Sequence, residues 1–164
     1  MAPIVIDTIR NDPAWHDGNY SSQPPSLRTA EEMLYLVGSN PVLRQQEMPT
    51  LAKSDATLDA AIAASMKTDD ANDVLYQLEA SRDYDPGPDL EKIRAPLFAV
   101  NSADDLINPP ELGILEREIK RIPKGRAVIV PMSAETRGHG THTIAAVWKK
   151  YLEALLSISG HVAH

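Results

Sequence analysis

The sequence contains no cysteine, and this absence excludes several kinds of protein at once. Disulfide-stapled scaffolds, thiolate zinc sites and cysteine nucleophiles all require thiols. Aromatic residues make up only 5% of the 164 residues, so the core has to be built mainly from Leu, Ile, Val and Ala. This length is enough for one domain with a substantial core and too short for two large domains.

Basic clusters are also missing. The formal net charge is -7, and no run of Lys and Arg is longer than the pair Lys149 and Lys150. Nucleic-acid-binding proteins need a basic footprint to displace counterions from phosphates, and anionic membranes attract basic segments in the same way. The charge balance therefore argues against nucleic acid and against a membrane surface as partners.

Long apolar runs are absent as well. No stretch approaches the roughly 20 apolar residues that a membrane-spanning helix requires. Residues 1–7 lack the basic segment and the long apolar stretch of a signal peptide. We therefore expect the cytoplasm as the default location, although the start of the parent protein is expected to lie upstream.

The first half of the chain is polar and is interrupted repeatedly by prolines, which mark turns and helix boundaries. No strand pattern occurs in it. Short helices joined by proline-rich loops suit a cap laid over another structure, so residues 1–88 are predicted to form a helical cap or lid. Apolar residues at helical spacing predict helices over 29–37, 55–66 and 70–80.

The pattern changes at Pro96, where short, continuous apolar runs begin. Residues 97–100 and 126–130 have the composition of strands that are buried on both faces. A helix is predicted between them over 109–122, and an amphipathic helix is predicted after them over 143–156. The order strand, helix, strand, helix predicts a parallel pair in an α/β fold.

Two parallel strands do not make a stable sheet, because such strands need neighbours and cover on both faces. We therefore expect residues 89–158 to be the C-terminal part of a larger parallel sheet, with 159–164 as a tail. The uncovered apolar faces predict a chain that is marginally stable, aggregation-prone or oligomeric. A missing N-terminal core region is the expected partner, and a homodimer is the alternative.

Polar loops follow both predicted strands, at residues 101–108 and 137–142. Catalytic groups collect at this edge of a parallel sheet, beyond the carboxyl ends of the strands. An acid, Asp104 or Asp105, follows the first strand, and His139 follows the second. An acid and then a histidine, after an earlier serine, is the order that α/β-hydrolases use.

Other roles are open to the same side chains. Asp104 or Asp105 can simply cap the helix that follows. His139 and His142 have the spacing of a metal-binding pair, but no third ligand is evident. His142 also suits packing or capping at the start of the last helix.

The stretch from Asp89 to Leu156 resembles the C-terminal end of the homoserine O-acetyltransferase-like branch of the α/β-hydrolase superfamily. The resemblance rests on the run Ala-Asp-Asp-Leu-Ile-Asn-Pro at 103–109 and on the Gly-His pair at 138–139. The helical segment before them is similar to the cap that this branch inserts between sheet strands. The resemblance implies a parent enzyme that moves an acyl group through a serine ester.

The same resemblance implies roles for individual residues and substrates. His139 would be the general base, Asp104 would hold the imidazolium in orientation, and Asp105 and His142 would have supporting roles. The acyl donor would be acetyl-CoA, as a substrate and not as a bound cofactor, or an ester. The acceptor would be an alcohol such as a homoserine-like hydroxyl, or water. No cofactor and no metal are expected.

The Gly-x-Ser-x-Gly elbow of such enzymes is absent from the sequence. Ser39 comes nearest, but Pro41 stands where the second glycine belongs. The donors of an oxyanion hole would lie in the same missing region, so the chain alone is predicted to be inactive. The alternative is a noncatalytic fragment or interaction module.

Overall fold

The computed structural model describes residues 2–159, and these fall into two compact units. The first unit comprises the chain up to residue 36 together with 44–84, and the second comprises 37–43 and the chain from residue 85 onward. The division expected at residue 88 lies inside a 3₁₀ helix, η2 (Gly87–Lys92). Of the tail expected at 159–164, Ser159 ends the last helix, and residues 160–164 lie outside the described part.

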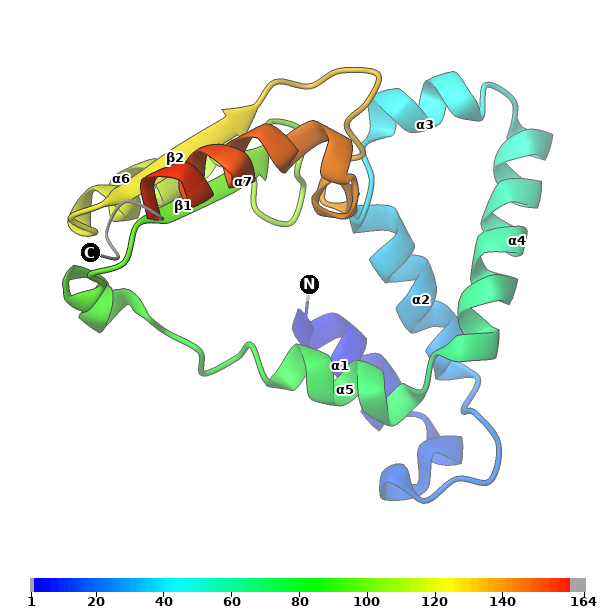
Figure 1. Ribbon diagram of the computed structural model, residues 1–164. Coiled ribbons are helices and arrows are strands. Elements are labelled where there is room, and N and C mark those ends of the chain that lie inside the picture. The colour runs from blue at the N-terminus through cyan, green and yellow to red at the C-terminus, as the bar shows by residue number, and fades with distance from the viewer. Residues whose placement is uncertain (1, 160–164) are drawn as a thin grey trace. The chain divides into compact units, whose positions relative to one another are not determined.

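The described part of the first unit is helical (Figure 1), in agreement with the absence of a strand pattern. The three helices expected over 29–37, 55–66 and 70–80 are confirmed. Three further helices, two within residues 2–18 and one that crosses the boundary between the units, carried too short a pattern to be predicted. The helices are α1 (Ala2–Arg10), η1 (Pro13–Gly18), α2 (Ser26–Val37), α3 (Pro41–Glu47), α4 (Leu51–Thr68) and α5 (Ala71–Glu79).

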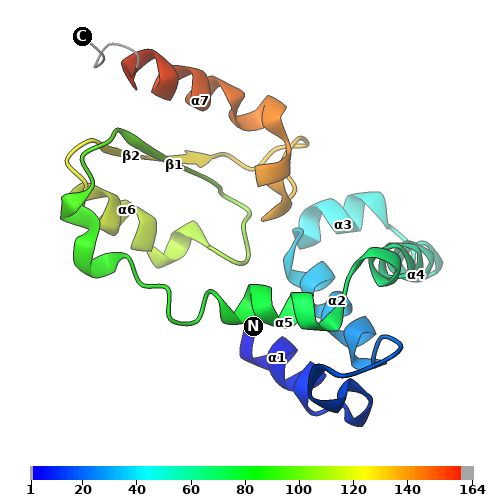
Figure 2. The same cartoon turned by 60° about the horizontal axis from the view of Figure 1, so that its bottom comes forward.

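The core of the first unit forms where α1 and α5 lie side by side (Figures 1 and 2). Helix α1 presents Val5, Ile6 and Ile9 on one face, and all three side chains are buried. Burying an aliphatic side chain of this size contributes about 1.5–3 kcal/mol, which explains why so short a helix is held in place. The buried cluster consists of Val5, Ile6, Ile9, Leu27, Ala30, Ala71, Val74 and Leu75.

The second unit contains the two predicted strands, β1 (Leu97–Ser102) and β2 (Gly125–Val130). They pair in parallel, as expected, in a register that runs from Leu97 beside Gly125 to Ser102 beside Val130. Both strands therefore end at the same edge of the sheet, and the loops that follow them start from neighbouring positions.

The connection between the strands is not the single helix expected over 109–122. It consists of η3 (Pro110–Leu112), α6 (Ile114–Glu118) and η4 (Ile119–Arg121). Gly113 separates the first two with a φ of 63°, a left-handed conformation that interrupts a helix and that glycine adopts without strain.

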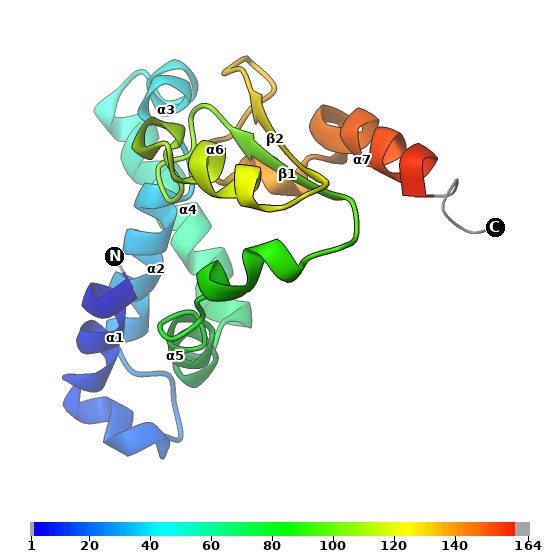
Figure 3. The same ribbon diagram turned by 90° about the vertical axis from the view of Figure 1, so that its left-hand side faces the viewer.

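The last segment contains η5 (Gly140–Thr143) and α7 (Ala145–Ser159), which confirms the expected terminal helix. Figures 2 and 3 show α6 and α7 on opposite faces of the two-stranded sheet. Each face of β1 therefore has one covering helix. Within residues 2–159, no helix is both long and apolar enough to cross a membrane.

Candidate functional site

The turn after β1 is shaped by Asp105. One carboxylate oxygen, Oδ1, accepts hydrogen bonds from the backbone N–H groups of Ile107, at 2.8 Å, and Asn108, at 3.0 Å. The Asp105 N–H donates to the carbonyl of Ser102, the last residue of the strand. These bonds hold the buried Asp105 side chain in one direction and leave its other oxygen, Oδ2, free to face the neighbouring loop.

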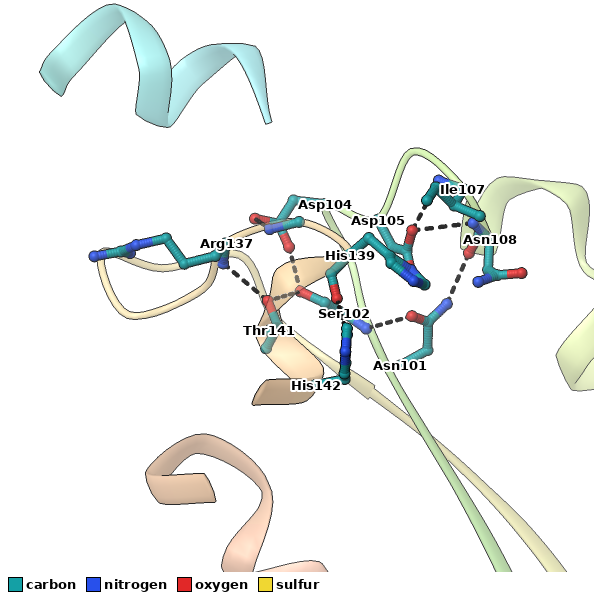
Figure 4. A network of polar contacts seen from close by, with 11 residues as sticks. Asn101, Ser102, Asp104, Asp105, Ile107, Asn108, Arg137, His139, Thr141 and His142 are labelled. Atoms are coloured by element: carbon teal, nitrogen blue, oxygen red, sulfur yellow. Dashed lines mark hydrogen bonds and ion pairs between the residues drawn. The ribbon is translucent and has the colours of Figure 1, made fainter. Parts of the chain in front are cut away.

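His139 lies opposite Asp105 in the loop after β2. Its Nδ1 is 3.0 Å from Asp105 Oδ2, and the imidazole is about one-third exposed (Figure 4). The other ring nitrogen, Nε2, makes no hydrogen bond within residues 2–159. An acid that accepts the Nδ1 proton selects the tautomer in which Nε2 carries a free lone pair, which is the form that can accept a proton.

Gly138 allows this placement of His139. Its φ is 60°, and a Cβ at this position would lie 2.9 Å from the backbone carbonyl carbon of Ser39. Only glycine fits so close to another backbone at a positive φ. The N–H of Gly140 donates to the carbonyl of Gly38 at 3.1 Å, so residues 38–40 hold the histidine loop on both sides of His139.

The expected pairing of Asp104 with His139 is wrong. The Asp104 carboxylate turns away from the imidazole and is buried beneath the histidine loop, with 8% of its surface exposed. Successive residues that leave a strand point in different directions, so only one of two neighbouring acids reaches the histidine. Here that acid is Asp105.

Asp104 instead joins three segments of the second unit. Its Oδ2 accepts hydrogen bonds from Asn40 Nδ2 at 2.6 Å, Thr136 Oγ1 at 2.9 Å and the Gly138 N–H at 3.0 Å. Its Oδ1 accepts a hydrogen bond from Ser102 Oγ (Figure 4). The carboxylate therefore fixes the backbone of the residue before His139, and acts on the histidine through its loop.

Sequence reasoning missed Asn40, Thr136 and Thr141 as parts of this network. All three are buried, and Thr141 Oγ1 accepts a hydrogen bond from the Arg137 N–H at 2.8 Å. Asn40 is 64 residues from Asp104 in the chain, so no local pattern connects them. One signal in the sequence could have favoured Asp105. It lies two residues before Ile107 and three before Asn108, so its side chain can accept hydrogen bonds from their backbone N–H groups in an Asx turn.

His142 occupies the place expected for it, at the start of the last helical segment. Its Nδ1 lies 2.6 Å from the carbonyl of His139, and its own carbonyl accepts from Trp148 Nε1. The two imidazole rings lie 5.0 Å apart between centroids. Within residues 2–159, no three His, Cys, Asp or Glu side chains gather closely enough to hold a metal ion.

Both acids have a pKa below the ordinary value for aspartate. Burial raises the pKa of Asp104, but the hydrogen bonds from Ser102, Gly138 and Thr136 outweigh it. Burial likewise raises the pKa of Asp105, but the hydrogen bonds from Asn108, His139 and Ile107 have the larger, opposite effect, so the net pKa is lowered. Both groups are therefore stabilised as carboxylates.

These shifts predict that the second unit loses stability in acid. A carboxyl group whose pKa is lower in the folded state stabilises the fold above its unfolded pKa of about 3.9, and this stabilisation is lost as pH falls through the folded value. The chain has two tryptophans, and Trp148 lies in the second unit. In a Trp15→Phe background, we expect the denaturant midpoint read by Trp148 fluorescence to fall between about pH 6 and pH 3.

Asp104→Asn is the control for that measurement, because it removes one of the two titrating groups. The variant should start from a lower midpoint and show a weaker dependence on pH. An unchanged pH dependence in the variant would show that Asp104 does not supply the acid sensitivity.

A hollow of about 1150 Å³ adjoins the His139 side chain. It lies within the second unit, and both His139 and Asp105 border it. Apolar side chains from β1, α6 and α7 line part of the wall, together with residues of the loops and of the 3₁₀ helices. Within residues 2–159, no serine, threonine or tyrosine hydroxyl hydrogen-bonds to the His139 ring.

Comparisons with known proteins identify the fold. No family model matches the sequence, and no curated protein matches it significantly. Among solved structures, the homoserine O-acetyltransferase from Bacillus anthracis aligns with a TM-score of 0.75 and 19% identity, over 94% of this chain and 48% of that chain. An acetylester hydrolase from Corynebacterium glutamicum aligns with a TM-score of 0.67 and 18% identity, over 94% of this chain and 47% of that chain.

The acetyl esterase MekB aligns over 99% of this chain and 48% of its own, with a TM-score of 0.60 and 18% identity. The chain thus spans about half the length of the solved structures that it matches. Identities this low establish the fold and not the reaction. The order of elements, the parallel strand pair and the helical segment before it confirm the expected fold class. The chain has the fold of the C-terminal part of an α/β-hydrolase.

Proposed function

We propose that this chain supplies the acid and the base of a serine-dependent acyl-transfer enzyme, with Asp105 as the acid and His139 as the base. The observation that carries the proposal is the 3.0 Å contact between Asp105 Oδ2 and His139 Nδ1, at the carboxyl ends of two parallel strands. The structural neighbours, an acetyltransferase and esterases, support acyl transfer as the class of reaction.

In this proposal, His139 Nε2 accepts the proton of a serine hydroxyl as the hydroxyl oxygen attacks the acyl carbonyl carbon. Asp105 accepts the Nδ1–H and stabilises the imidazolium that forms, without taking its proton. His139 then donates the proton to the leaving group. In the second half of the reaction, His139 deprotonates the acceptor, which attacks the acyl-serine, and the imidazolium returns the proton to the serine oxygen as the acyl–oxygen bond breaks.

The serine and the oxyanion donors belong to the part of the fold that this chain does not span. The acyl donor would be acetyl-CoA or an ester, each as a substrate, and the acceptor would be a small alcohol or water. The missing elbow motif also favours a second candidate, a noncatalytic interaction module, because an acid and a base without a nucleophile cannot form an acyl-enzyme.

The coding sequence upstream of Met1 separates these two candidates. If a Gly-x-Ser-x-Gly segment is read in frame, the longer protein should hydrolyse p-nitrophenyl acetate, and His139→Ala should lower kcat by about 10⁴-fold or more. His142→Ala is the matched control and should keep most of the activity, since His142 Nδ1 contacts a backbone carbonyl. The 164-residue chain alone should stay at background.

Two results would contradict the proposal. One is a longer protein whose activity survives His139→Ala. The other is an upstream sequence without a serine elbow, together with an inactive chain, which would favour the noncatalytic module.

A further inference from the structure

His139 and His142 each keep one ring nitrogen without a partner. The His139 Nδ1 lies 3.0 Å from the Asp105 carboxylate, and the His142 Nδ1 lies 2.6 Å from the carbonyl oxygen of His139 (Figure 4). A carboxylate and a carbonyl only accept hydrogen bonds, so in the neutral imidazole each Nδ1 carries the proton. Both rings are thereby held as the tautomer with a lone pair on Nε2, and neither Nε2 has a hydrogen-bond partner among residues 2–159.

The two rings lie at the separation that a shared metal ion requires. Their centroids are 5.0 Å apart, and their planes are tilted by 56°. Two imidazoles that bind one tetrahedral Zn²⁺, each through a nitrogen about 2.0–2.1 Å from the metal, have centroids about 5 Å apart. The observed separation therefore allows one ion to bind both Nε2 atoms.

The hydrogen-bond partners of the two rings are those of metal-binding histidines. A histidine that binds a metal through one nitrogen donates the N–H of its other nitrogen to a carboxylate or a backbone carbonyl, which fixes the tautomer and makes the ligand more basic. His139 has the first kind of partner, in the buried Asp105, and His142 has the second. Asp105 also places a negative charge behind the His139 ring, which favours a cation.

The main chain holds the two histidines in this relation. They lie three residues apart in the loop and 3₁₀ turn that follow β2. The Thr141 N–H donates to the Gly138 carbonyl at 3.0 Å, which closes the turn around His139. Trp148 Nε1 in α7 donates to the His142 carbonyl at 2.9 Å. The relative position of the two rings therefore depends on the backbone, and not on side-chain packing alone.

An ion between these rings would have two protein ligands. Both imidazoles border the hollow of the second unit, and His142 is exposed, so solvent reaches the pair. No group of three His, Cys, Asp or Glu side chains in the described part of the chain is arranged to hold an ion. A tetrahedral ion would therefore keep two positions for water or for an anionic ligand, and it would exchange readily.

We propose that His139 and His142 form an exchangeable binding site for Zn²⁺, held by the two Nε2 atoms and completed by water. Imidazole nitrogen is a ligand that suits Zn²⁺, whereas Mg²⁺ and Ca²⁺ prefer oxygen. The ion occupies the lone pair with which His139 accepts the serine proton in the proposed function. Zn²⁺ therefore blocks acyl transfer reversibly, and this consequence, unlike the metal site itself, rests on the proposed function.

The test uses the full 164-residue chain and ZnCl₂, and it measures no enzymatic activity. The chain has five histidines, and His161 and His164 repeat the spacing of the proposed pair outside the described residues. Both are therefore changed to Ala in every sample, and His16, in the first unit, is kept as an internal reference. Isothermal titration calorimetry gives the affinity and the stoichiometry, and nitrogen chemical shifts of the imidazoles identify the ligands.

We expect one Zn²⁺ per chain, with the Nε2 signals of His139 and His142 shifting together and the signals of His16 unchanged. His139→Ala and His142→Ala should each weaken binding by about tenfold or more, because a single nitrogen ligand remains. MgCl₂ at the same concentration should leave all three rings unchanged.

Asp105→Asn tests the partner behind the His139 ring. The asparagine amide can donate to Nδ1 and move the ring proton to Nε2, where the ion would have to displace it. Loss of such a partner weakens metal sites by about 10–100-fold, and we expect a loss of this size here. Glu135→Gln is the matched control, because it removes an exposed carboxylate from the same loop and leaves both histidines in place. Its affinity for Zn²⁺ should equal that of the parent chain.

Several outcomes would overturn the proposal. No binding, a shift of only one of the two rings, or full affinity in His142→Ala would show that the pair does not share an ion. One Zn²⁺ per two chains, with a dimer mass, would place the ion between two copies. The amide spectrum before zinc is added shows whether each variant folds, and the titration of the chain that keeps both histidines decides the question even if a variant does not. Binding through both rings would support the site even if the longer protein proves inactive, so the two proposals can fail separately.

Discussion

Asp105→Asn is expected to lower kcat by about 10⁴-fold in a protein that joins this chain to a serine elbow. The reason is the tautomer of His139. The Asp105 carboxylate can only accept the Nδ1 proton, whereas an asparagine amide can donate to Nδ1 and move the proton to Nε2. An Nε2 that carries a proton cannot accept one from the serine.

The change in tautomer can be measured without activity. Nitrogen chemical shifts of the His139 ring distinguish an Nδ1–H from an Nε2–H, so the experiment works on the 164-residue chain. We expect Nδ1–H in the unmodified chain and a shift toward Nε2–H in Asp105→Asn. Asp104→Asn is the neighbouring control, and should leave the His139 tautomer unchanged because Asp104 does not contact the ring.

This expectation reverses the one that follows from the family resemblance, where Asp104 is the catalytic acid. The assignment of Asp104 as the catalytic acid would be restored by two results together. Asp104→Asn would have to lower kcat and change the His139 tautomer, and Asp105→Asn would have to leave both kcat and the tautomer unchanged. Equal losses with no change in tautomer would show that neither acid orients the imidazole.

Asp104→Ala is expected to destabilise the second unit by about 3 kcal/mol or more. The substitution leaves the donors of Asn40, Thr136, Ser102 and Gly138 without their acceptor, and each unsatisfied buried group costs about 1–3 kcal/mol where water cannot replace the partner. For a unit of this size, 3 kcal/mol corresponds to a fall in Tm of roughly 12–24 °C.

Each unit has its own fluorescent reporter, because Trp15 lies in the first unit and Trp148 in the second. Trp15→Phe leaves Trp148 to follow the second unit, and Trp148→Phe leaves Trp15 to follow the first. Asp104→Ala should lower the Tm read by Trp148 and leave the Tm read by Trp15 nearly unchanged. Asp104→Asn keeps one acceptor oxygen, so its Tm read by Trp148 should lie between that of the unmodified chain and that of Asp104→Ala. A Trp148 transition that does not move would show that the Asp104 network does not stabilise the second unit.

Much of the fold could be predicted from local pattern. The apolar runs at 97–100 and 127–130 predict two strands, and a helical connection between them favours the parallel pairing that is observed. Parallel strands end at one edge, so the sequence alone brings the loop with Asp104 and Asp105 close to the loop with His139. Gly138 before the histidine likewise predicts unusual backbone angles, and its φ of 60° agrees.

Sequence patterns did not predict the structure of short segments that depend on distant contacts. Helix α1 spans nine residues and is stabilised by burial against α5, some sixty residues along the chain, and not by its own propensity. The helix expected over 109–122 breaks at Gly113, whose left-handed φ is set by the path between β1 and β2.

Which of the two aspartates lies beside His139 was decided only by the tertiary structure. Asp104 and Asp105 are adjacent and chemically identical, so no pattern of residue types separates them. Their directions depend on the backbone angles after β1, and these are set by hydrogen bonds from Asn40, 64 residues before Asp104, and from Thr136, 32 residues after it. The sequence by itself determined that an acid and His139 meet at one edge of a sheet. Long-range hydrogen bonds buried Asp104 beneath the loop and left Asp105 facing the histidine.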